Sequence, residues 1–342
     1  MRAYSIKPLI SVVVPVYNQR AVFLSACLKS VLAQSFSDFE LVVSDNHSTN
    51  DARDVIASFN DPRIRVVKPP QHLKLVPHFA FAAQQIKGPF ISFLSSDDIV
   101  EPHWLQSLVP ALQDNEGAVF AFGEIAGVAH TNTDHILYLC RNKKMPSGTL
   151  SPDQLLELII PLTRTAAWLV GDVIRSDAYF ATGGMAQQGV IYGGDHALAL
   201  KLLELGSAVY VNKLVGRHRV WRASDGKQDA ERSLQAIDDV TSLYRLMDDN
   251  AVLKKDPDRY RTQIAQAKTR KSRLLALSLL SRNGESQLTS AQYAVFREKI
   301  LHLDSNVATK AILALGAVAG VRRLSAAAVP GLRRALRAAK FS

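Results

Sequence analysis

The sequence predicts an α/β fold in which helices cover both faces of a mostly parallel sheet, with a helical extension at the C-terminal end. Three observations carry this prediction. Short β-branched runs alternate with amphipathic segments through the first hundred residues, the connections between them are short, and the pattern becomes helical from about residue 230 onward. Alternation with short connections implies right-handed crossovers and therefore parallel strands.

The first half of the chain supplies the regular part of this pattern. Ile10–Val16 is a continuous apolar run of the kind found in strands buried on both faces. Ala21–Gln34 repeats apolar residues at the spacing of one helix face. The same reasoning predicts strands at Phe39–Val43, Ile64–Val67 and Phe90–Leu94, and helices at Asp51–Phe59, Pro77–Ile86 and Pro102–Gln113.

The second half is mixed. Strands are predicted at Val119–Ile125, Ile136–Leu139, Ala167–Ile174, Ala208–Val211 and Leu214–Val220. Helices are predicted from Ser151-Pro152 and at Asp195–Leu205, Leu234–Met247, Arg259–Leu280 and Ala291–Leu303. The polar stretch Ser224–Gln228 suggests three parts: a domain over residues 1–225, a helical extension over 226–305 and a tail over 306–342.

Positive charge is concentrated in that tail. The formal net charge is +10, and residues 306–342 contain seven basic side chains and no acidic one. Leu332, Leu336 and Ala339 fall on one face of a helix that has Arg333 and Arg337 on the other, which favours contact with anionic lipid headgroups. A solvated helix or tail is the alternative. Nucleic acid is disfavoured because the body shows no basic patch with interleaved aromatic residues.

The sequence also limits the cellular setting. Two cysteines exclude a disulfide framework and a four-cysteine zinc site. There is no recognisable signal sequence and no uncharged apolar run of about 18 residues. We therefore expect a cytoplasmic protein that can lie peripherally on the inner face of the cell membrane.

Polar residues follow three of the predicted strands. The first strand ends in Pro15 and Tyr17, the second ends at Asp45, and the fourth is followed by Ser96, Asp97 and Asp98. Ligands of open α/β sheets bind beyond the carboxyl ends of the strands, so these groups are expected to share one site. Adjacent carboxylates suit Mg²⁺ or Mn²⁺ held together with substrate phosphates, which suggests a nucleoside diphosphate ligand.

Other nucleotide-binding classes fit less well. The chain has no Gly-x-x-x-x-Gly-Lys-Ser/Thr loop, no Gly-x-Gly-x-x-Gly after the first strand and no His-Glu-x-x-His motif. These absences argue against a P-loop NTPase, a dinucleotide-binding Rossmann domain and a zinc hydrolase.

Five sequence blocks together resemble the family 2 glycosyltransferases, which have the GT-A fold. The blocks are SVVVPVYN (11–18), ELVVSDNHSTN (40–50), GPFISFLSSDD (88–98), GGM (183–185) and GDHALALKLL (194–203). The resemblance spans roughly residues 8–222. It implies an enzyme that transfers a sugar from a nucleotide-sugar donor with inversion at the anomeric carbon.

The resemblance also implies residue roles. Asp45 matches the residue that binds the pyrimidine base, which implies a UDP- or dTDP-sugar, and Pro15 and Tyr17 match the turn at the base and ribose. Asp97 matches the metal ligand of the family's Asp-x-Asp motif, with Ser96 and Asp98 beside it. Asp195 matches the general base. The chain departs from the family where Ser95 and Gly194 replace an Asp and a Glu.

Further residues have open roles. Trp168 and Trp221 are expected either to stack on sugar rings or to pack in the core. His218, Arg219 and Arg222 lie where the family often places basic groups near the diphosphate, with a solvated surface as the alternative. His196 is a candidate contact of the acceptor.

The leading hypothesis is a metal-assisted inverting glycosyltransferase of polysaccharide or cell-envelope biosynthesis. Its acceptor would be a saccharide or a lipid-linked saccharide. One alternative is a catalytically weak nucleotide-sugar-binding module of a membrane-associated assembly complex. The other is a nucleotidyltransferase, which would need a glycine-rich loop after the first strand that Asn18-Gln19-Arg20 does not provide.

Overall fold

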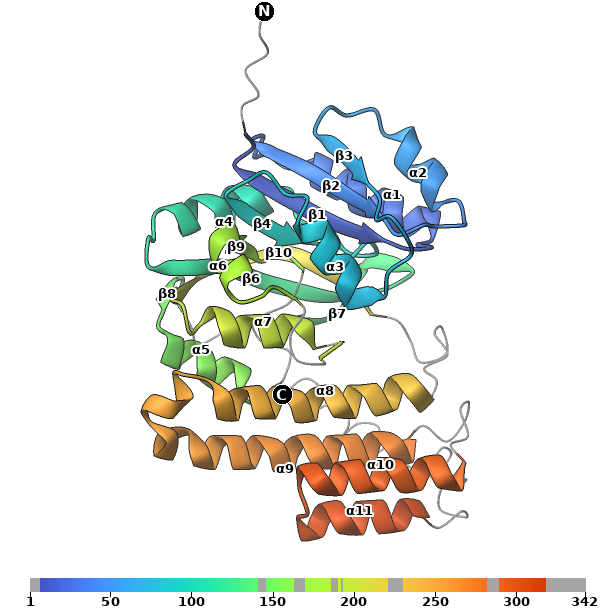
Figure 1. The fold of residues 1–342 in the computed structure, drawn as a ribbon, viewed down its shortest axis with the longest axis vertical. Coiled ribbons are helices and arrows are strands. Elements are labelled where there is room, and N and C mark those ends of the chain that lie inside the picture. Colours follow the sequence, from blue (N-terminus) through green and yellow to red (C-terminus); the bar gives the residue numbers. More distant parts are fainter. Residues whose placement is uncertain are drawn as a thin grey trace, which may run out of the picture. The chain divides into compact units, whose positions relative to one another are not determined.

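A computed structural model of the chain describes residues 7–140, 146–162, 170–185, 190–191, 193–220, 230–281 and 289–317. The chain divides into two compact units (Figure 1). Unit 1 comprises Met1–Leu155, Thr165–Gln187 and Gly194–Val220, and unit 2 comprises Leu156–Arg164, Gln188–Gly193 and Trp221–Ser342. Among the helices described, none combines the length and the apolar character needed to cross a bilayer.

A single sheet organises unit 1. In the described residues its strand order is β3-β2-β1-β4-β9-β6-β10-β5, with β7 paired to β6 and β8 paired to β10. The strands are β1 Ile10–Val16, β2 Phe39–Asp45, β3 Ile64–Val67, β4 Phe90–Phe93, β5 Ile99–Val100, β6 Ala118–Ala129, β7 Asn132–Cys140, β8 Gly148–Leu150, β9 Val173–Arg175 and β10 Ser207–Val220. β3, β2, β1 and β4 run parallel, as do β6 and β10, while the remaining pairs are antiparallel.

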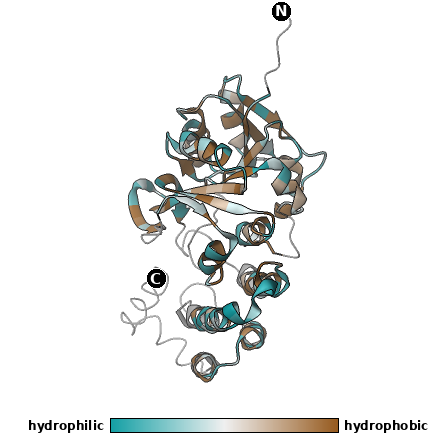
Figure 2. Cartoon of the chain, turned by 90° about the vertical axis from the view of Figure 1, so that its left-hand side faces the viewer, coloured by the Kyte–Doolittle hydropathy of each residue, from teal (hydrophilic) through white to brown (hydrophobic). Residues whose placement is uncertain are grey.

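Helices cover both faces of this sheet, which confirms the predicted fold class. α1 (Ala21–Leu32), α2 (Ala52–Ser58) and α4 (Trp104–Gln113) share one buried core with the alternate β1 residues from Ile10 to Val16. On the other face Phe93 of β4 contacts Phe79 of α3 (Leu75–Ala83) and Tyr179 of α6 (Ser176–Ala181), with ring centroids 5.6 Å and 5.4 Å apart. Figure 2 shows hydrophobic residues running along the strands. α7 (Gly194–Leu202) lies on the same face as α3 and α6, because Leu198 and Ala199 border a cavity with Phe93.

Unit 2 is helical where the structure describes it. Its long helices are α8 (Ala230–Asp249), α9 (Pro257–Ser281), α10 (Ser290–Leu303) and α11 (Val307–Ala317), with a short 3₁₀ turn at Leu253–Lys255. They share a buried core of Ile237, Ala276, Tyr293, Phe296, Ile300 and Leu313. Thr289 begins α10 with a capping box to Gln292, which explains the sharp start of that helix. The helix α5 (Pro152–Ile159) begins at the predicted Ser-Pro signal.

Some predicted boundaries were wrong. The strand expected at Ala167–Ile174 lies partly outside the described residues; from residue 170 onward it begins only at Val173, because Gly171 adopts φ +95° and turns the chain just before it. The two runs expected at 208–211 and 214–220 form one strand, β10, whose pairing with β6 shifts register between Val211 and Gly216. β5, β8 and α6 are too short to show a periodic pattern.

Several predictions concern residues that the structure does not describe. The proposed domain boundary at 224–228 and the tail from residue 318 onward fall outside the described ranges. The same holds for Trp168, Trp221 and Arg222.

Candidate functional site at the carboxyl edge of the sheet

Hydrogen bonds join the turns that follow β1 and β2. Parallel pairing places Val16 opposite Asp45, so both strands end at the same level. Asp45 is buried, and its Oδ1 accepts a hydrogen bond from the Ser48 backbone N–H at 2.9 Å. The Ser48 hydroxyl in turn accepts from the Asn18 N–H at 3.0 Å. Asp45 is thus held at the point where the two turns meet.

Asn18 and Gln19 extend this connection to a third turn. Asn18 adopts the left-handed conformation (φ +48°), which asparagine tolerates better than most residues, and its Oδ1 accepts from the Thr49 N–H at 2.7 Å. Asn50 Nδ2 donates to the Gln19 carbonyl at 3.0 Å, and Gln19 Nε2 donates to Ser96 Oγ at 3.1 Å. Residues 15–20, 45–50 and 95–98 therefore form one connected group, which we name the carboxyl-edge turns.

An aromatic pair stands beside them. Tyr17 is 52% exposed, and its ring centroid lies 4.5 Å from that of His72, with the planes inclined by 46°. His72 Nδ1 lies 3.1 Å from the Asn46 carbonyl oxygen, and the Asn46 side chain bonds to both backbone groups of Leu73, at 2.7 and 2.9 Å. These contacts hold the His72 ring beside Asn46, the residue after Asp45, and the Tyr17 ring that faces it is half exposed to solvent. Pro15 lies inside β1, paired with Ser44 and two positions before the exposed Tyr17.

The two carboxylates after β4 have different environments. The side chain of Asp98 is 1% exposed, and its two oxygens face the Arg219 backbone N–H at 2.8 Å and His218 Nδ1 at 3.3 Å. Asp97 is only partly buried. Asp98 thus fastens the turn to β10, while Asp97 is the carboxylate that solvent can reach.

Arg219 supports the same turn from β10. Its side chain is buried, Nε donates to the Asp97 carbonyl, and Nη1 donates to the His130 carbonyl at 2.9 Å. The guanidinium carbon lies 4.7 Å from the centroid of the Phe23 ring. Burial lowers the pKa of Arg219, while the neighbouring carboxylates of Asp98 and Asp97 act to raise it. The contacts described for Arg219 therefore position the turn.

Cys27 lies beneath the carboxylates. Its Sγ is 3.6 Å from the Ser95 carbonyl oxygen, and burial raises the pKa of the thiol well above its ordinary value, with Asp98 and Asp97 adding to the effect. It is a buried neutral thiol, as the sequence predicts.

Asp195 lies near the start of α7. Its Oδ1 accepts from the His196 backbone N–H at 2.8 Å, and His196 Nδ1 lies 3.1 Å from the same oxygen. The two side chains are each 13% exposed. Asp195 also borders a small cavity, lined further by Phe93, Phe120, Asp172, Ile174, Leu198, Ala199 and Leu202. The lining of that cavity includes neither Asp45 nor Asp97. Hydrogen bonds link the turns that carry Asp45 and Asp97 to one another, whereas Asp195 is positioned by α7.

Packing against Met185 explains why a residue as small as glycine occupies position 194. A Cβ atom built there would lie 3.0 Å from Cε of Met185, so a larger residue would have to displace that methyl group. The space beside the candidate base is thus occupied by Met185.

Sequence reasoning missed two kinds of residue. Gln19 and Asn46 tie turns together, and nothing in their spacing marks that role. Asp172, which shares the cavity of Asp195, carries a buried Oδ1 with no hydrogen-bond partner in the described part of the chain. The available signal for Asp172 was a single carboxylate inside the otherwise apolar run from residue 169 to 174.

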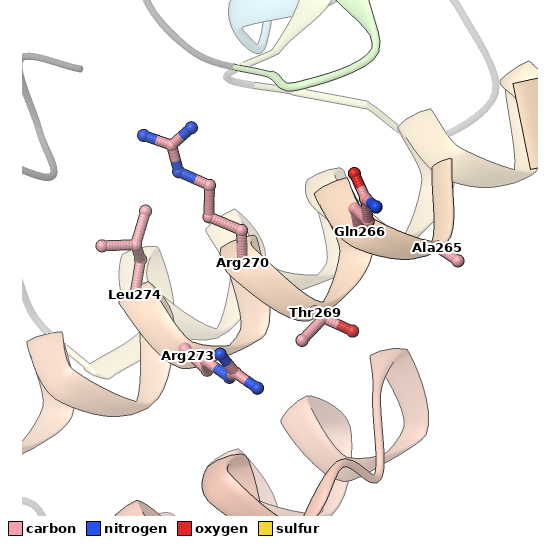
Figure 3. A pocket seen from close by; sticks show the side chains of 6 residues that line it. All are labelled: Ala265, Gln266, Thr269, Arg270, Arg273 and Leu274. Atoms are coloured by element: carbon pink, nitrogen blue, oxygen red, sulfur yellow. The ribbon is translucent and has the colours of Figure 1, made fainter. Parts of the chain in front are cut away.

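A second hollow lies on α9 of unit 2. Figure 3 shows its six lining residues, which are Ala265, Gln266, Thr269, Arg270, Arg273 and Leu274. None of the six carries a carboxylate, and none is a predicted site residue.

Comparison with known proteins agrees with the fold. The profile of the family described as Glycosyl transferase family 2 matches residues 11–167. An uncharacterized glycosyltransferase of Nostoc sp. is 36% identical over 123 residues, 35% of each chain. The GalNAc(5)-diNAcBac-PP-undecaprenol beta-1,3-glucosyltransferase of Campylobacter jejuni is 34% identical over 120 residues, which are 34% of this chain and 38% of that protein. The chain thus spans little more than a third of the length of these two relatives.

The solved structures extend the likeness of fold to the helical part. Residues 1–349 of S. aureus TarS superpose with a TM-score of 0.58 at 14% identity, covering 97% of this chain and 90% of that one. The strand order, the five sequence blocks and the family match on residues 11–167 agree with one another. Residues 11–167 therefore match family 2 of the glycosyltransferases, and the fold of the chain resembles that of TarS.

Proposed function

We propose that the protein transfers a sugar from a UDP- or dTDP-sugar to a saccharide or lipid-linked saccharide, with inversion at the anomeric carbon. The observation that carries this proposal is the hydrogen-bonded group of carboxyl-edge turns around Asp45. Two relatives support it. A TarS structure in complex with UDP-GlcNAc superposes with a TM-score of 0.50 at 15% identity, and the C. jejuni relative is named as a glucosyltransferase acting on an undecaprenol-linked saccharide.

Asp45 would select the base of the donor. Its Oδ1 is used by Ser48, and no donor within the described part of the chain contacts Oδ2. A carboxylate oxygen can accept from the ring N–H that uracil and thymine carry and that cytosine lacks. The half-exposed Tyr17 ring offers a face on which a flat base can stack.

A divalent cation fits one residue of the third turn. Both oxygens of Asp98 already face protein donors, so Asp97 is the carboxylate suited to Mg²⁺ or Mn²⁺. In the part of the chain that the structure describes, no group of three His, Cys, Asp or Glu side chains gathers around a possible ion. This donor set suits an ion that takes most of its ligands from a diphosphate, whose developing negative charge it would stabilise during transfer.

Asp195 would act as the general base. The acceptor hydroxyl gives its proton to the Asp195 carboxylate as its oxygen bonds to the anomeric carbon, and the bond to the diphosphate breaks with its electron pair. The hydrogen bond that the His196 N–H donates to Oδ1 fixes the orientation of the Asp195 carboxylate. The basic tail is proposed to bring the enzyme to anionic lipid where the acceptor is membrane-bound.

The test compares turnover of UDP-sugars by the wild type, Asp195→Asn and the control Asp258→Asn, with and without Mn²⁺. Asp258 is an exposed carboxylate on α9 of unit 2, 82% exposed, and its loss should leave turnover unchanged. Asp195→Asn should lower kcat by about 10²–10⁴-fold while UDP still binds. Full turnover by Asp195→Asn would exclude it as the base.

A further inference from the structure

Asp172 carries a buried carboxylate oxygen that has no hydrogen-bond partner in the described part of the chain. The residue lies between Gly171 and β9, and this oxygen, Oδ1, is inaccessible to solvent. A buried ionised carboxylate without donors is costly, so such a group either loses its charge or serves a purpose that repays the cost.

The surroundings of Asp172 point to the first outcome. It borders the same cavity as Asp195, and the other lining residues, which come from β4, β6, β9 and α7, are apolar. Asp195 is therefore the one titratable side chain that faces Asp172 across this cavity in the described residues. Burial raises the pKa of Asp172 well above its usual value, and the nearby charge of Asp195 raises it further.

We propose that Asp172 is a positioning residue for Asp195: it remains a neutral carboxylic acid, so that Asp195 alone carries negative charge in their shared cavity. Two carboxyl groups in one apolar space lose their protons in two separate steps. Asp195 is partly exposed and accepts the His196 N–H bond, as suits a carboxylate that receives the acceptor proton. Asp172 keeps its proton throughout the transfer, and the acceptor proton goes to Asp195. This kinetic role rests on the proposed function, whereas the protonation state of Asp172 does not.

The first test needs no substrate. In the unfolded chain Asp172 ionises near pH 3.9, as an ordinary aspartate does. Between that pH and its raised value in the folded state, the folded protein holds one proton more, so stability falls as pH rises. The Asp172→Asn variant lacks this loss. Its melting temperature relative to the wild type should therefore rise steadily as pH is raised from 4 toward 8, while that of the control Asp258→Asn should not.

A constant difference in melting temperature would show that Asp172 ionises normally, and would overturn the proposal. If Asp172→Asn does not fold, Asp172→Leu provides the same comparison with an apolar side chain. Failure of both neutral variants to fold would mean that the site requires a charge, which also contradicts the proposal.

The second test measures kcat against pH during transfer from a UDP-sugar. The profile of kcat against pH should differ in shape between Asp172→Asn and the wild type, because the amide cannot ionise. The wild type should show one ionisation, above that of an ordinary aspartate, that Asp172→Asn lacks. If Asp172→Asn instead loses as much activity as Asp195→Asn, Asp172 is itself an ionised base and the proposal fails. Absence of turnover by the wild type with every nucleotide sugar would count against the proposed function, while the melting comparison would still decide the state of Asp172.

Discussion

The buried acids at the two edges of the parallel strands differ in the number of hydrogen bonds that they accept. At the amino edge, Glu40 accepts four hydrogen bonds from protein groups: Ser11 Oγ at 2.7 Å and the Lys87 N–H at 2.8 Å on one oxygen, and Arg65 Nε and Nη2 at 3.1 and 2.9 Å on the other. At the carboxyl edge, Asp45 is equally buried but accepts one, from Ser48.

This difference separates an acid that stabilises the fold from one with room for a further partner. Glu40 has no hydrogen-bonding capacity left to offer, and it ties β1, β2, β3 and the segment before β4 together. In the described part of the chain no donor contacts the second oxygen of Asp45, which suits the proposed contact with a nucleotide base. A buried carboxylate whose partners are incomplete costs stability that only a bound ligand can return.

The largest expected effect is on the amino edge. Glu40→Ala removes the partner of the half-buried Arg65 guanidinium. It should lower the free energy of unfolding by about 3 kcal/mol. Urea unfolding monitored by circular dichroism would measure this. Affinity for UDP, measured on the protein that remains folded, should stay as in the wild type. An unchanged unfolding midpoint would remove the distinction between the two edges.

Next in size is the loss of the exposed carboxylate after β4. Asp97→Asn should lower kcat/KM by about 10²-fold, because a neutral amide holds a divalent cation poorly. The measurement is turnover over a Mn²⁺ titration, in which the variant should need more metal. Chelation of the metal with EDTA should reduce the wild type to a similar rate. Equal metal dependence in variant and wild type would contradict the role of Asp97.

A smaller effect is expected at the base-binding end. Asp45→Asn replaces the acceptor oxygen with a group that can also donate, so affinity for UDP should fall by about tenfold relative to affinity for CDP. Isothermal titration with both nucleotides gives this ratio. Stability should change little, since the bond to the Ser48 N–H can be kept by the amide oxygen. An unaltered UDP-to-CDP ratio would show that Asp45 does not contact the base.

The smallest effect concerns the link between turns. Gln19→Ala removes the hydrogen bond to Ser96 and should raise KM for the donor by a few-fold, corresponding to about 1 kcal/mol, with kcat preserved. Initial-rate kinetics separate the two parameters. A fall in kcat at constant KM would indicate that Gln19 acts on the chemistry and not on the shape of the donor site.

The sequence predicted the parts of this molecule that depend on local pattern. Continuous apolar runs gave β1, β2 and β4, and the polar residues after them gave Asp45, Asp97 and Asp98 as neighbours. Pairings across long separations could not be read in this way. The hydrogen bond from the Arg219 N–H to Asp98 joins residues 121 positions apart. Asp172 and Asp195 line the same cavity only once the chain has folded.

Short elements were missed for a related reason. β5 has two residues and β8 has three, so neither can show an alternating pattern, and both exist because β10 offers them an edge. The resemblance to the family pointed to Asp195, which α7 alone would present as an ordinary residue of a helix start.

The attachment of Asp98 to β10 has a consequence for biosynthesis. The acid is made early in translation, but the two groups that satisfy it, His218 Nδ1 and the Arg219 N–H, emerge 120 and 121 residues later. Until then the nascent chain carries a carboxylate that cannot be buried without penalty, so the loop after β4 has to stay hydrated on the ribosome. A truncated chain that ends before β10 would keep β1 to β9 and yet lack the two groups that hold Asp98.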